Sequence, residues 1–417
     1  MHHKTYLNIP KRKTERTPEE IVSMRVQFSP CGIGLGHVGR CLPIARKLEE
    51  RGAQVLFSTY KDGTRYVQQE RFQVVEVPPI EFVVKPDGTV DFKQSLVSIG
   101  PFLSSFTLLK QVEAEIDIMK AFKPDVVVSD SRASPLIAAK LLGIPDICIL
   151  NQFQIIVPRQ TRFLRLARLA DAGTLAIIGK LWTSVKRVLI PDYPQPYTLS
   201  AGNLRIPNGY QKRVRLIGPI IPVRPNELPS QKQIRKKLGL SENRPVIFAP
   251  ISGPVKERAY FTGVLRQIFK EFPDDYQIVM SLGYPNASTE PIRKGNVIVY
   301  EWMPNRFEYL KACDLVVARA GHGTLAQSIC YGKPIILVPT PSHTEQLNNA
   351  GRAVELGIAE MIEQDNLNKQ TLLRAVQKLL RDKRFKDRMR QIQEEVIGLD
   401  GIETAVQNIM EVTEWGN

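Results

Sequence analysis

Two glycine-rich turns hold the residues best suited to chemistry, because each contains a histidine and precedes a helical stretch. The first turn spans residues 30–37, has the sequence PCGIGLGH and follows an apolar run at 25–29. The second spans residues 321–324, has the sequence GHGT and follows an apolar run at 314–317. Glycines let backbone N–H groups approach a ligand, and the positive end of the following helix attracts an anion. Both turns are therefore candidate binding sites for a charged ligand.

The second turn is suited to a diphosphate. An arginine two residues before it would add a fixed positive charge, and its threonine would add a hydroxyl at the start of the helix. The residues predicted to bind the diphosphate are Arg319, Gly321, Gly323 and Thr324, and His322 is predicted to contact the diphosphate or a sugar. His343 is predicted with equal weight as a sugar contact or as a loop residue without a ligand.

Two dipeptides follow other apolar runs and belong at the same edge of the sheet. Ser252 and Gly253 come after the run at 245–249 and would provide further backbone donors to phosphate. Glu345 and Gln346 come after the run at 335–338, and the carboxyl edge of a parallel sheet is where open α/β folds bind ligands.

The first turn is suited to proton transfer. The imidazole of His37 titrates near neutral pH, so it can take a proton from an attacking hydroxyl group. A base of this kind works better when a carboxylate holds its tautomer, and Asp130 ends the apolar run at 125–129. We predict that Asp130 orients His37. The alternative that Asp130 caps the helix predicted at 134–142 stays open, because aspartate favours that position.

Four segments resemble the nucleotide-sugar site of the GT-B glycosyltransferases. This family includes the UDP-glycosyltransferases and the bacterial enzymes that add N-acetylglucosamine to the lipid-linked peptidoglycan precursor. The segments that carry the resemblance are, in chain order, Trp302-Met303-Pro304-Asn305, Gly321 to Thr324, Gly332-Lys333-Pro334, and Glu345-Gln346 with Asn349-Ala350. Their order agrees with the family pattern, and one residue is missing between Trp302 and the glycine turn.

The resemblance implies an inverting, metal-independent transfer of sugar from a nucleotide-diphosphate sugar, expected to be a UDP sugar, to a hydroxyl group. It implies that Trp302 and Met303 lie near the base, that Glu345 and Gln346 contact the sugar, and that His37 is the catalytic base. Gly34 and Gly36 then belong to a loop on the acceptor side. The nucleotide sugar is a substrate, so no cofactor is expected.

Gln327 departs from the family pattern. The family usually has a glutamate here, which binds the ribose hydroxyls, whereas a glutamine binds them without charge. Two other functions also stay open. The turn at 34–41 resembles that of a nucleotide-sugar hydrolase of the same fold, in which the histidine activates water. The chain could instead bind a nucleotide without catalysis.

Apolar runs alternate with helical stretches through the 417 residues. This alternation predicts an α/β protein with two doubly wound, Rossmann-like domains that face each other across a cleft, as in the GT-B fold. We predict a flexible basic arm at 1–23, an acceptor-binding domain at 24–218 and a nucleotide-sugar domain at 219–384. Residues 385–417 are predicted to form a helix that crosses back to the first domain.

The formal net charge of +15 suggests that the protein binds an anionic partner. Basic and apolar residues alternate between 159 and 187, which predicts contact with an anionic membrane surface, although a solvated amphipathic helix gives the same pattern. The candidate residues are Arg159, Arg162, Phe163, Arg165, Arg168 and Trp182, with Lys180, Lys186 and Arg187 nearby. The acceptor is accordingly expected to be a lipid or a lipid-linked molecule. Nucleic acid is not predicted as a partner, because aromatic residues are sparse and no nucleic-acid-binding motif occurs.

Five cysteines without a Cys-x-x-Cys pair argue against a disulfide framework and against structural zinc. The segment 1–23 lacks the apolar run of a signal peptide. We therefore expect a cytoplasmic protein, peripheral on the inner face of the cell membrane.

Overall fold

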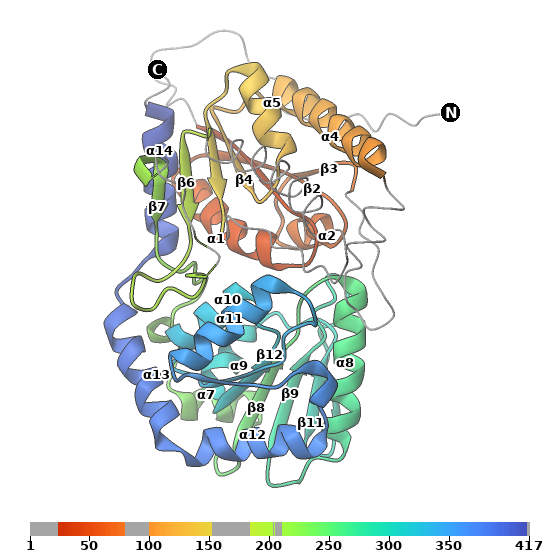
Figure 1. Ribbon diagram of the computed structural model, residues 1–417, viewed down its shortest axis with the longest axis vertical. Helices are drawn as coiled ribbons and strands as arrows, with labels where there is room; N and C mark the ends of the chain where they lie inside the picture. The colour runs from red at the N-terminus through yellow and green to blue at the C-terminus, as the bar shows by residue number, and fades with distance from the viewer. Residues whose placement is uncertain (1–23, 80–99, 152–183, 203, 205–210, 415–417) are drawn as a thin grey trace, which may run out of the picture.

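The computed structural model describes residues 24–79, 100–151, 184–202, 204 and 211–414. Two α/β domains lie one above the other, each with a central sheet between helices (Figure 1). The predicted basic arm and the membrane candidates between Arg159 and Trp182 fall outside the described residues. In the part of the chain that is described, no helix is both long enough and apolar enough to cross a membrane.

The amino-terminal sheet is parallel and has seven described strands in the order β3-β2-β1-β4-β5-β6-β7. The strands are β1 (Arg25–Pro30), β2 (Gln54–Thr59), β3 (Val74–Glu76), β4 (Val126–Asp130), β5 (Asp146–Ile149), β6 (Arg187–Ile190) and β7 (Val214–Leu216). The helices are α1 (Gly36–Glu50), α2 (Asp62–Gln69), α4 (Gly100–Phe122) and α5 (Ser134–Leu142). The strand order reverses between β1 and β4, and open α/β sheets bind ligands at the carboxyl ends of such neighbours.

The carboxyl-terminal sheet repeats this plan in the order β10-β11-β9-β8-β12-β13-β14, with β10 antiparallel to β11. Its strands are β8 (Val246–Pro250), β9 (Gln277–Ser281), β10 (Ile292–Lys294), β11 (Val297–Tyr300), β12 (Leu315–Ala318), β13 (Ile335–Leu337) and β14 (Ala359–Met361). Its helices are α7 (Gln231–Leu238), α8 (Val255–Lys270), α9 (Arg306–Ala312), α10 (His322–Cys330), α11 (Thr344–Glu355), α12 (Lys369–Arg381) and α13 (Lys383–Val396). Short 3₁₀ turns are η1 (Gln211–Arg213), η2 (Pro225–Glu227) and η3 (Gln364–Asn366). The predicted fold class is confirmed.

The helix α14 (Gly401–Glu414) belongs to the amino-terminal domain, although it comes last in the described chain (Figure 1). Its buried side chains join the core that contains Val26 and Phe28; they are Ala405, Val406, Ile409 and Val412. Each larger apolar side chain buried in this way contributes roughly 1.5–3 kcal/mol. Because α13 packs in the carboxyl-terminal domain, the chain crosses between the domains at residues 397–400, later than the predicted start at 385.

The boundary between the two domains in the middle of the chain also differs from the predicted one at residues 218 and 219. Ile220 packs in the amino-terminal core and Ile221 in the carboxyl-terminal core, so the main connection lies there. However, the side chains of Tyr193, Tyr197 and Leu199 are buried in the carboxyl-terminal core. The segment that follows β6 therefore joins the second domain before β7 returns to the first sheet.

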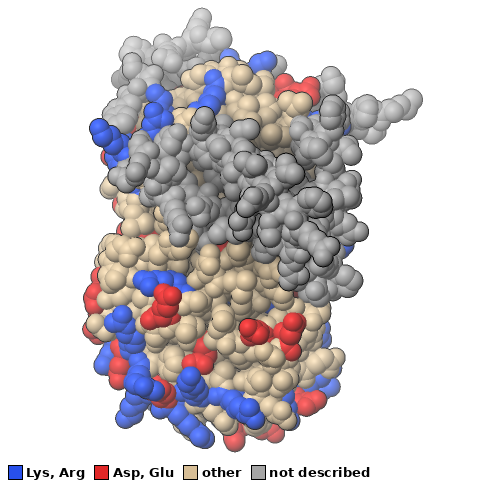
Figure 2. All heavy atoms as spheres, viewed as in Figure 1, with Lys and Arg blue, Asp and Glu red and all other residues tan. Residues whose placement is uncertain are grey.

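The net charge is not gathered on the visible face of the carboxyl-terminal domain, where basic and acidic side chains are interspersed (Figure 2). Arg187, which belongs to the basic pattern between 159 and 187 in the sequence, is almost fully buried at the start of β6. Its Nη1 donates to Asn408 Oδ1 at 2.7 Å and to Glu411 Oε2 at 2.6 Å. Arg187 therefore lies neither on a membrane-contacting surface nor on a solvated basic face, because its guanidinium binds residues of α14.

Candidate active site

His37 and Asp130 meet at the point where the amino-terminal strand order reverses. The two side chains come from the first turn of α1 and the end of β4, and His37 Nδ1 lies 2.7 Å from Asp130 Oδ1. The Asp130 side chain is fully buried, whereas 28% of the His37 side chain is exposed. Because Nδ1 is occupied by the carboxylate, Nε2 is the nitrogen left for a substrate. The capping alternative for Asp130 is wrong, since α5 begins after Ala133 and has no side-chain cap.

Arg40 is a third member of this cluster that our sequence reasoning missed. It lies one helical turn after His37, and its Nε and Nη2 both donate to the Asp130 carboxylate. Burial alone would raise the pKa of Asp130, but the charges of Arg40 and His37 outweigh burial and lower it to about 2. The carboxylate is therefore ionised and held in one orientation beside the imidazole.

The glycines of the first turn allow this turn to lie close to the end of β2 and to the carboxyl-terminal domain. A Cβ at Gly32 would lie 1.9 Å from the carbonyl oxygen of Tyr60, so only glycine fits there. Gly34 has a φ of +73°, and a Cβ on it would lie 3.4 Å from Gly253 Cα in the carboxyl-terminal domain. Gly36 is the first residue of α1. The predicted acceptor-side loop and the Ser252-Gly253 loop thus face each other closely across the cleft.

The start of α10 offers unpaired backbone donors to the same cleft. Its N-cap, Gly321, is extended and has no side-chain cap, so the N–H groups of the first turn have no partner within the helix. A Cβ on Gly321 or Gly323 would have nothing within 4 Å, so the space in front is open. A cavity of about 220 Å³ is lined by this turn together with His37, Asn151 and Glu345. The base candidate and the anion-binding turn therefore open on one space.

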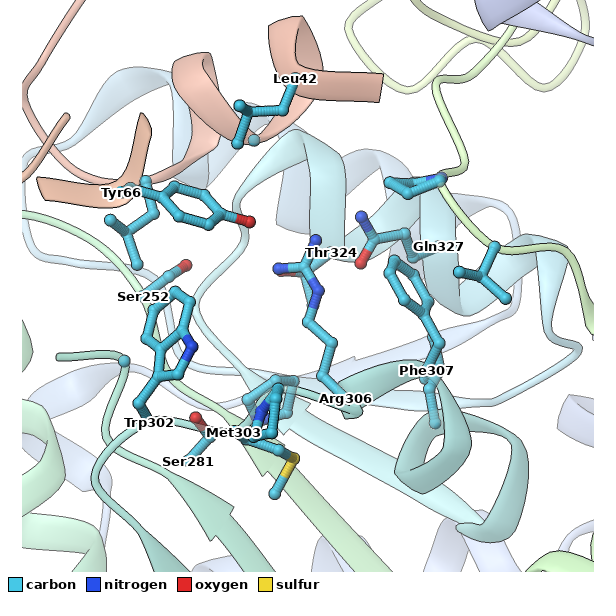
Figure 3. A pocket seen from close by; sticks show the side chains of 18 of the residues that line it. Leu42, Tyr66, Ser252, Ser281, Trp302, Met303, Arg306, Phe307, Thr324 and Gln327 are labelled. Carbon is cyan, nitrogen blue, oxygen red and sulfur yellow. The ribbon is translucent and has the colours of Figure 1, made fainter. Parts of the chain in front are cut away.

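A larger cavity of about 520 Å³ adjoins the first one between the domains (Figure 3). Trp302 and Met303 line it from the carboxyl-terminal domain, and Leu42 and Tyr66 line it from the other side. The rings of Tyr66 and Trp302 meet edge to face, with their centroids 5.2 Å apart. Both cavities are lined by Leu35, Gly39, Pro250, Ser252, Arg306, Thr324 and Gln327, which we call the neck. The predicted base and ribose contacts therefore line the larger cavity, and the predicted sugar contacts line the smaller one.

The structure does not support the predicted role of Arg319 at the diphosphate. Its guanidinium is almost fully buried: Nη1 donates to Val338 O at 2.9 Å and Nη2 donates to Gln364 Oε1 at 2.7 Å. It also lies 3.9 Å from the centre of the Phe261 ring and 3.7 Å from Glu257 Oε1. Burial lowers the pKa of Arg319 to about 10, although Glu257 opposes this change. Arg319 thus fixes the loops beneath the turn and has few donors left for a ligand.

Two further predicted ligand contacts also have structural partners. The Gln346 carboxamide accepts from Thr340 N at 2.8 Å and donates to Glu257 Oε1 at 3.2 Å, so it is not free for a sugar. Glu345, by contrast, lines the smaller cavity and accepts from Asn151 Nδ2 of the other domain at 2.6 Å. Both residues line the smaller cavity, but the Gln346 carboxamide is bound on both sides by its own domain, whereas Glu345 reaches across to Asn151.

The two remaining histidines of the cleft occupy different positions. His322 Nε2 lies 3.2 Å from Asp192 Oδ2, and both side chains are buried between the domains. His322 thus lies beside Asp192 and also lines the smaller cavity, so its contact with the diphosphate or the sugar stays a prediction. His343 caps α11, where its Nδ1 accepts from Gln346 N at 3.4 Å, and it also lines the smaller cavity.

A second ion pair connects α8 of the carboxyl-terminal domain to α2 of the amino-terminal domain. Arg258 Nη2 of α8 donates to Asp62 Oδ2 at the start of α2, at 3.0 Å. Arg258 is 1% exposed and stacks over the Tyr284 ring, and its Nη1 donates to Gly253 O at 3.3 Å. Arg258 thus connects the amino-terminal domain to the Ser252-Gly253 loop, in which Ser252 belongs to the neck.

The Asp192–His322 pair makes stability depend on pH in acid. Burial raises the pKa of Asp192, but the charge of His322 and the hydrogen bonds from Ser200 lower it to about 2, against about 3.9 in an unfolded chain. The unfolded state therefore binds more protons between these values, so about 2–3 kcal/mol of stability, complete above about pH 5, is lost as the pH falls toward 2.

We expect Asp192→Asn to be less stable than the wild type at pH 7 and the gap to shrink as the pH falls to 3. Urea unfolding followed by circular dichroism at pH 3 to 7 measures the gap. The exposed Asp275→Asn serves as the control, for which no such trend is expected. A gap for Asp192→Asn that is constant over this range would contradict the prediction.

Comparisons with known proteins agree with this geometry. Residues 256–404 match the family described as "Glycosyltransferase family 28 C-terminal domain", and residues 24–193 match "Glycosyl transferase family 1". An uncharacterized glycosyltransferase of Methanosarcina mazei is 28% identical over 388 residues, covering 93% of this chain and 98% of that protein. The UDP-N-acetylglucosamine--N-acetylmuramyl-(pentapeptide) pyrophosphoryl-undecaprenol N-acetylglucosamine transferase of Desulforamulus reducens is 25% identical over 377 residues. That alignment covers 86% of this chain and 91% of the relative.

Among solved structures, the calicheamicin glycosyltransferase CalG4 matches with a TM-score of 0.64 at 18% identity, covering 94% of this chain and 99% of that one. At this identity the likeness establishes the fold, with both sheets and the cleft between them. The matched families and the named relatives establish the activity class. This chain is a glycosyltransferase of the GT-B fold with a carboxyl-terminal domain of the family 28 type.

Proposed function

We propose that this glycosyltransferase moves a sugar from a nucleotide-diphosphate sugar, with UDP as the expected nucleotide, to an acceptor hydroxyl, and that it inverts the anomeric carbon. One observation carries the proposal. His37, held by Asp130, and the uncapped first turn of α10 line the same cavity from opposite domains. The cavity thus has a base on one side and an anion site on the other. This arrangement suits a direct displacement at an anomeric carbon that lies between them.

The chemistry follows from these positions. His37 Nε2 takes the proton of the acceptor hydroxyl while its oxygen attacks the anomeric carbon. The bond from that carbon to the diphosphate oxygen breaks, and the electron pair leaves with the nucleoside diphosphate. Attack from the face opposite the leaving group inverts the configuration. The backbone N–H groups at the start of α10 meet the charge of the leaving group, and closure of the cleft aligns the two reactants.

The acceptor is proposed to be a lipid-linked hydroxyl at the inner face of the cell membrane. The Desulforamulus reducens relative is named for an undecaprenol-linked acceptor, and the present chain carries a formal charge of +15, which favours an anionic surface. The scheme uses no metal, because the backbone N–H groups and the positive end of α10 meet the charge of the diphosphate.

The test uses purified protein, a panel of nucleotide sugars and vesicles of total polar lipid. Nucleotide release is measured with and without the vesicles, and the anomeric configuration of the product is read by NMR. We expect release from one donor that depends on lipid, and a product with inverted configuration. Retained configuration would contradict the displacement mechanism.

The same assay separates the other functions. Equal release with and without vesicles, accompanied by free sugar, would assign a nucleotide-sugar hydrolase. Nucleotide binding without release would assign a non-catalytic protein. Release that requires a water-soluble acceptor would keep the transferase and overturn the lipid acceptor.

A further inference from the structure

Arg306 is the charged residue of the neck, the set of seven residues that lines both cavities. It is the first residue of α9 and follows the Trp302-Met303-Pro304 segment. Figure 3 shows its side chain extending into the cavity, with the guanidinium toward Thr324 and Gln327. A nucleotide in the larger cavity and a sugar in the smaller one would be joined by their diphosphate at this neck.

The charge of Arg306 is not neutralised within the described residues. Its guanidinium has no hydrogen-bond or ion-pair partner among them, and its contact is with the ring of Phe307, 4.8 Å from its centroid. The other arginines that line the two cavities are engaged: Arg40 by Asp130, Arg46 by Glu49 and Glu70, and Arg319 by Val338, Gln364 and Glu257. An unpaired cation in a partly enclosed space creates a positive potential that favours an anionic ligand.

Gln327 brings no negative charge to the neck. It lies on α10 one turn after Thr324, and it shares the neck with Arg306. A carboxylate at this position would lie in the same small space and would neutralise the guanidinium. The neutral carboxamide can still bind a ribose hydroxyl, and it leaves the positive charge available.

We propose that Arg306 binds the diphosphate of the donor and neutralises the negative charge that grows on the nucleoside diphosphate as it leaves. This inference rests on the proposed function and assigns to Arg306 the role that the sequence pattern predicts for Arg319. The carbon–oxygen bond to the diphosphate breaks, its electron pair stays on the departing oxygen, and the guanidinium donates hydrogen bonds to that oxygen or its neighbours. The proton of the acceptor goes separately to His37.

Calorimetry of nucleotide binding tests the inference without requiring turnover. The tightest ligand among UDP, dTDP, GDP and ADP is found for the wild type, and its monophosphate and nucleoside are then compared. We expect Arg306→Gln to weaken diphosphate binding roughly 10- to 100-fold, to leave nucleoside binding nearly unchanged, and to lower kcat about 10²-fold or more. Arg306→Lys should recover part of both losses. The exposed Arg266→Gln on α8 is the matched control, with no expected change.

The outcomes separate this inference from the proposed function. Unchanged diphosphate affinity in Arg306→Gln would overturn the inference while the proposed function stands. An equal loss for nucleoside and diphosphate would also overturn it, because Arg306 would then recognise the base or the ribose. A wild type that binds none of the four nucleotides would overturn the proposed function itself, and the inference with it. Circular dichroism of each variant excludes misfolding as the cause.

The variant Gln327→Glu tests whether the neutral side chain at position 327 keeps the charge of Arg306 available to the diphosphate. In the wild-type background the new carboxylate should pair with Arg306 and weaken diphosphate binding about 10-fold. In the Arg306→Gln background the same change should cost clearly less, because no cation is left to neutralise. Equal costs in both backgrounds would show that the two side chains do not interact, and would overturn the role given to Gln327.

Discussion

Replacing His37 by alanine is expected to lower kcat for sugar transfer by about 10²- to 10⁴-fold and to leave nucleoside diphosphate binding almost unchanged. The imidazole is a base in the proposed reaction, and it lies on the domain opposite the turn that binds the diphosphate. Initial rates at saturating donor and calorimetry with the nucleoside diphosphate measure the two quantities. Loss of nucleotide affinity in parallel with the rate would contradict a role limited to proton transfer.

Asp130→Asn distinguishes a base from a merely structural histidine. An amide nitrogen beside Nδ1 would favour the tautomer with the proton on Nε2, so His37 could no longer accept a proton from the acceptor. We expect a loss of rate comparable to that of His37→Ala, and little further loss in the double variant, because both changes disable one unit. Two losses that multiply in the double variant would refute this coupling.

Removing the Arg258 side chain as Arg258→Met is expected to cost about 3–5 kcal/mol of unfolding free energy. The change leaves the buried carboxylate of Asp62 without its closest cation, since Arg65 Nη1 lies 4.0 Å away and on an exposed side chain. The Gly253 loop also loses a hydrogen bond from Arg258 Nη1. Urea unfolding by circular dichroism measures the change in stability.

The control for this prediction is the double variant Asp62→Asn/Arg258→Met. Breaking a buried pair is costly because one charge is left unpaired, so removal of both charges should restore most of the lost stability. Stability losses that simply add would show that the two residues are not coupled across the cleft.

The strands that the sequence predicted are those with long apolar runs, such as Val126 to Ser129 in β4. The strands that it missed are the three-residue β7, β10 and β14, together with β6. Arg187 opens β6, and its charge pointed to a surface helix until its partners Asn408 and Glu411 were known. Pairs separated by more than two hundred residues leave no local pattern, so β6 could not be predicted in this way.

The sequence predicted where the candidate residues lie in the fold, but not the direction in which each side chain points. The sequence indicated that His37, Asp130 and the turn at Gly321 belong at strand ends, and parallel sheets gather those ends at one edge. It could not show that Arg319 points into the core while Arg306 points into the cleft. Arg319 is held in the core by Val338, Gln364 and Phe261, which are distant in the sequence, so its direction could not be predicted from its neighbours in the chain.

The position of α14 affects the order in which the protein can be completed during translation. The first sheet leaves the ribosome early, but part of the surface of α1 and its neighbours remains uncovered until residues 401–414 have been made. Throughout synthesis of the second domain, the nascent first domain therefore exposes an apolar face, and Arg51 and Arg187 lack their acidic partners Glu403 and Glu411. The domain that is synthesised first is the last to be finished.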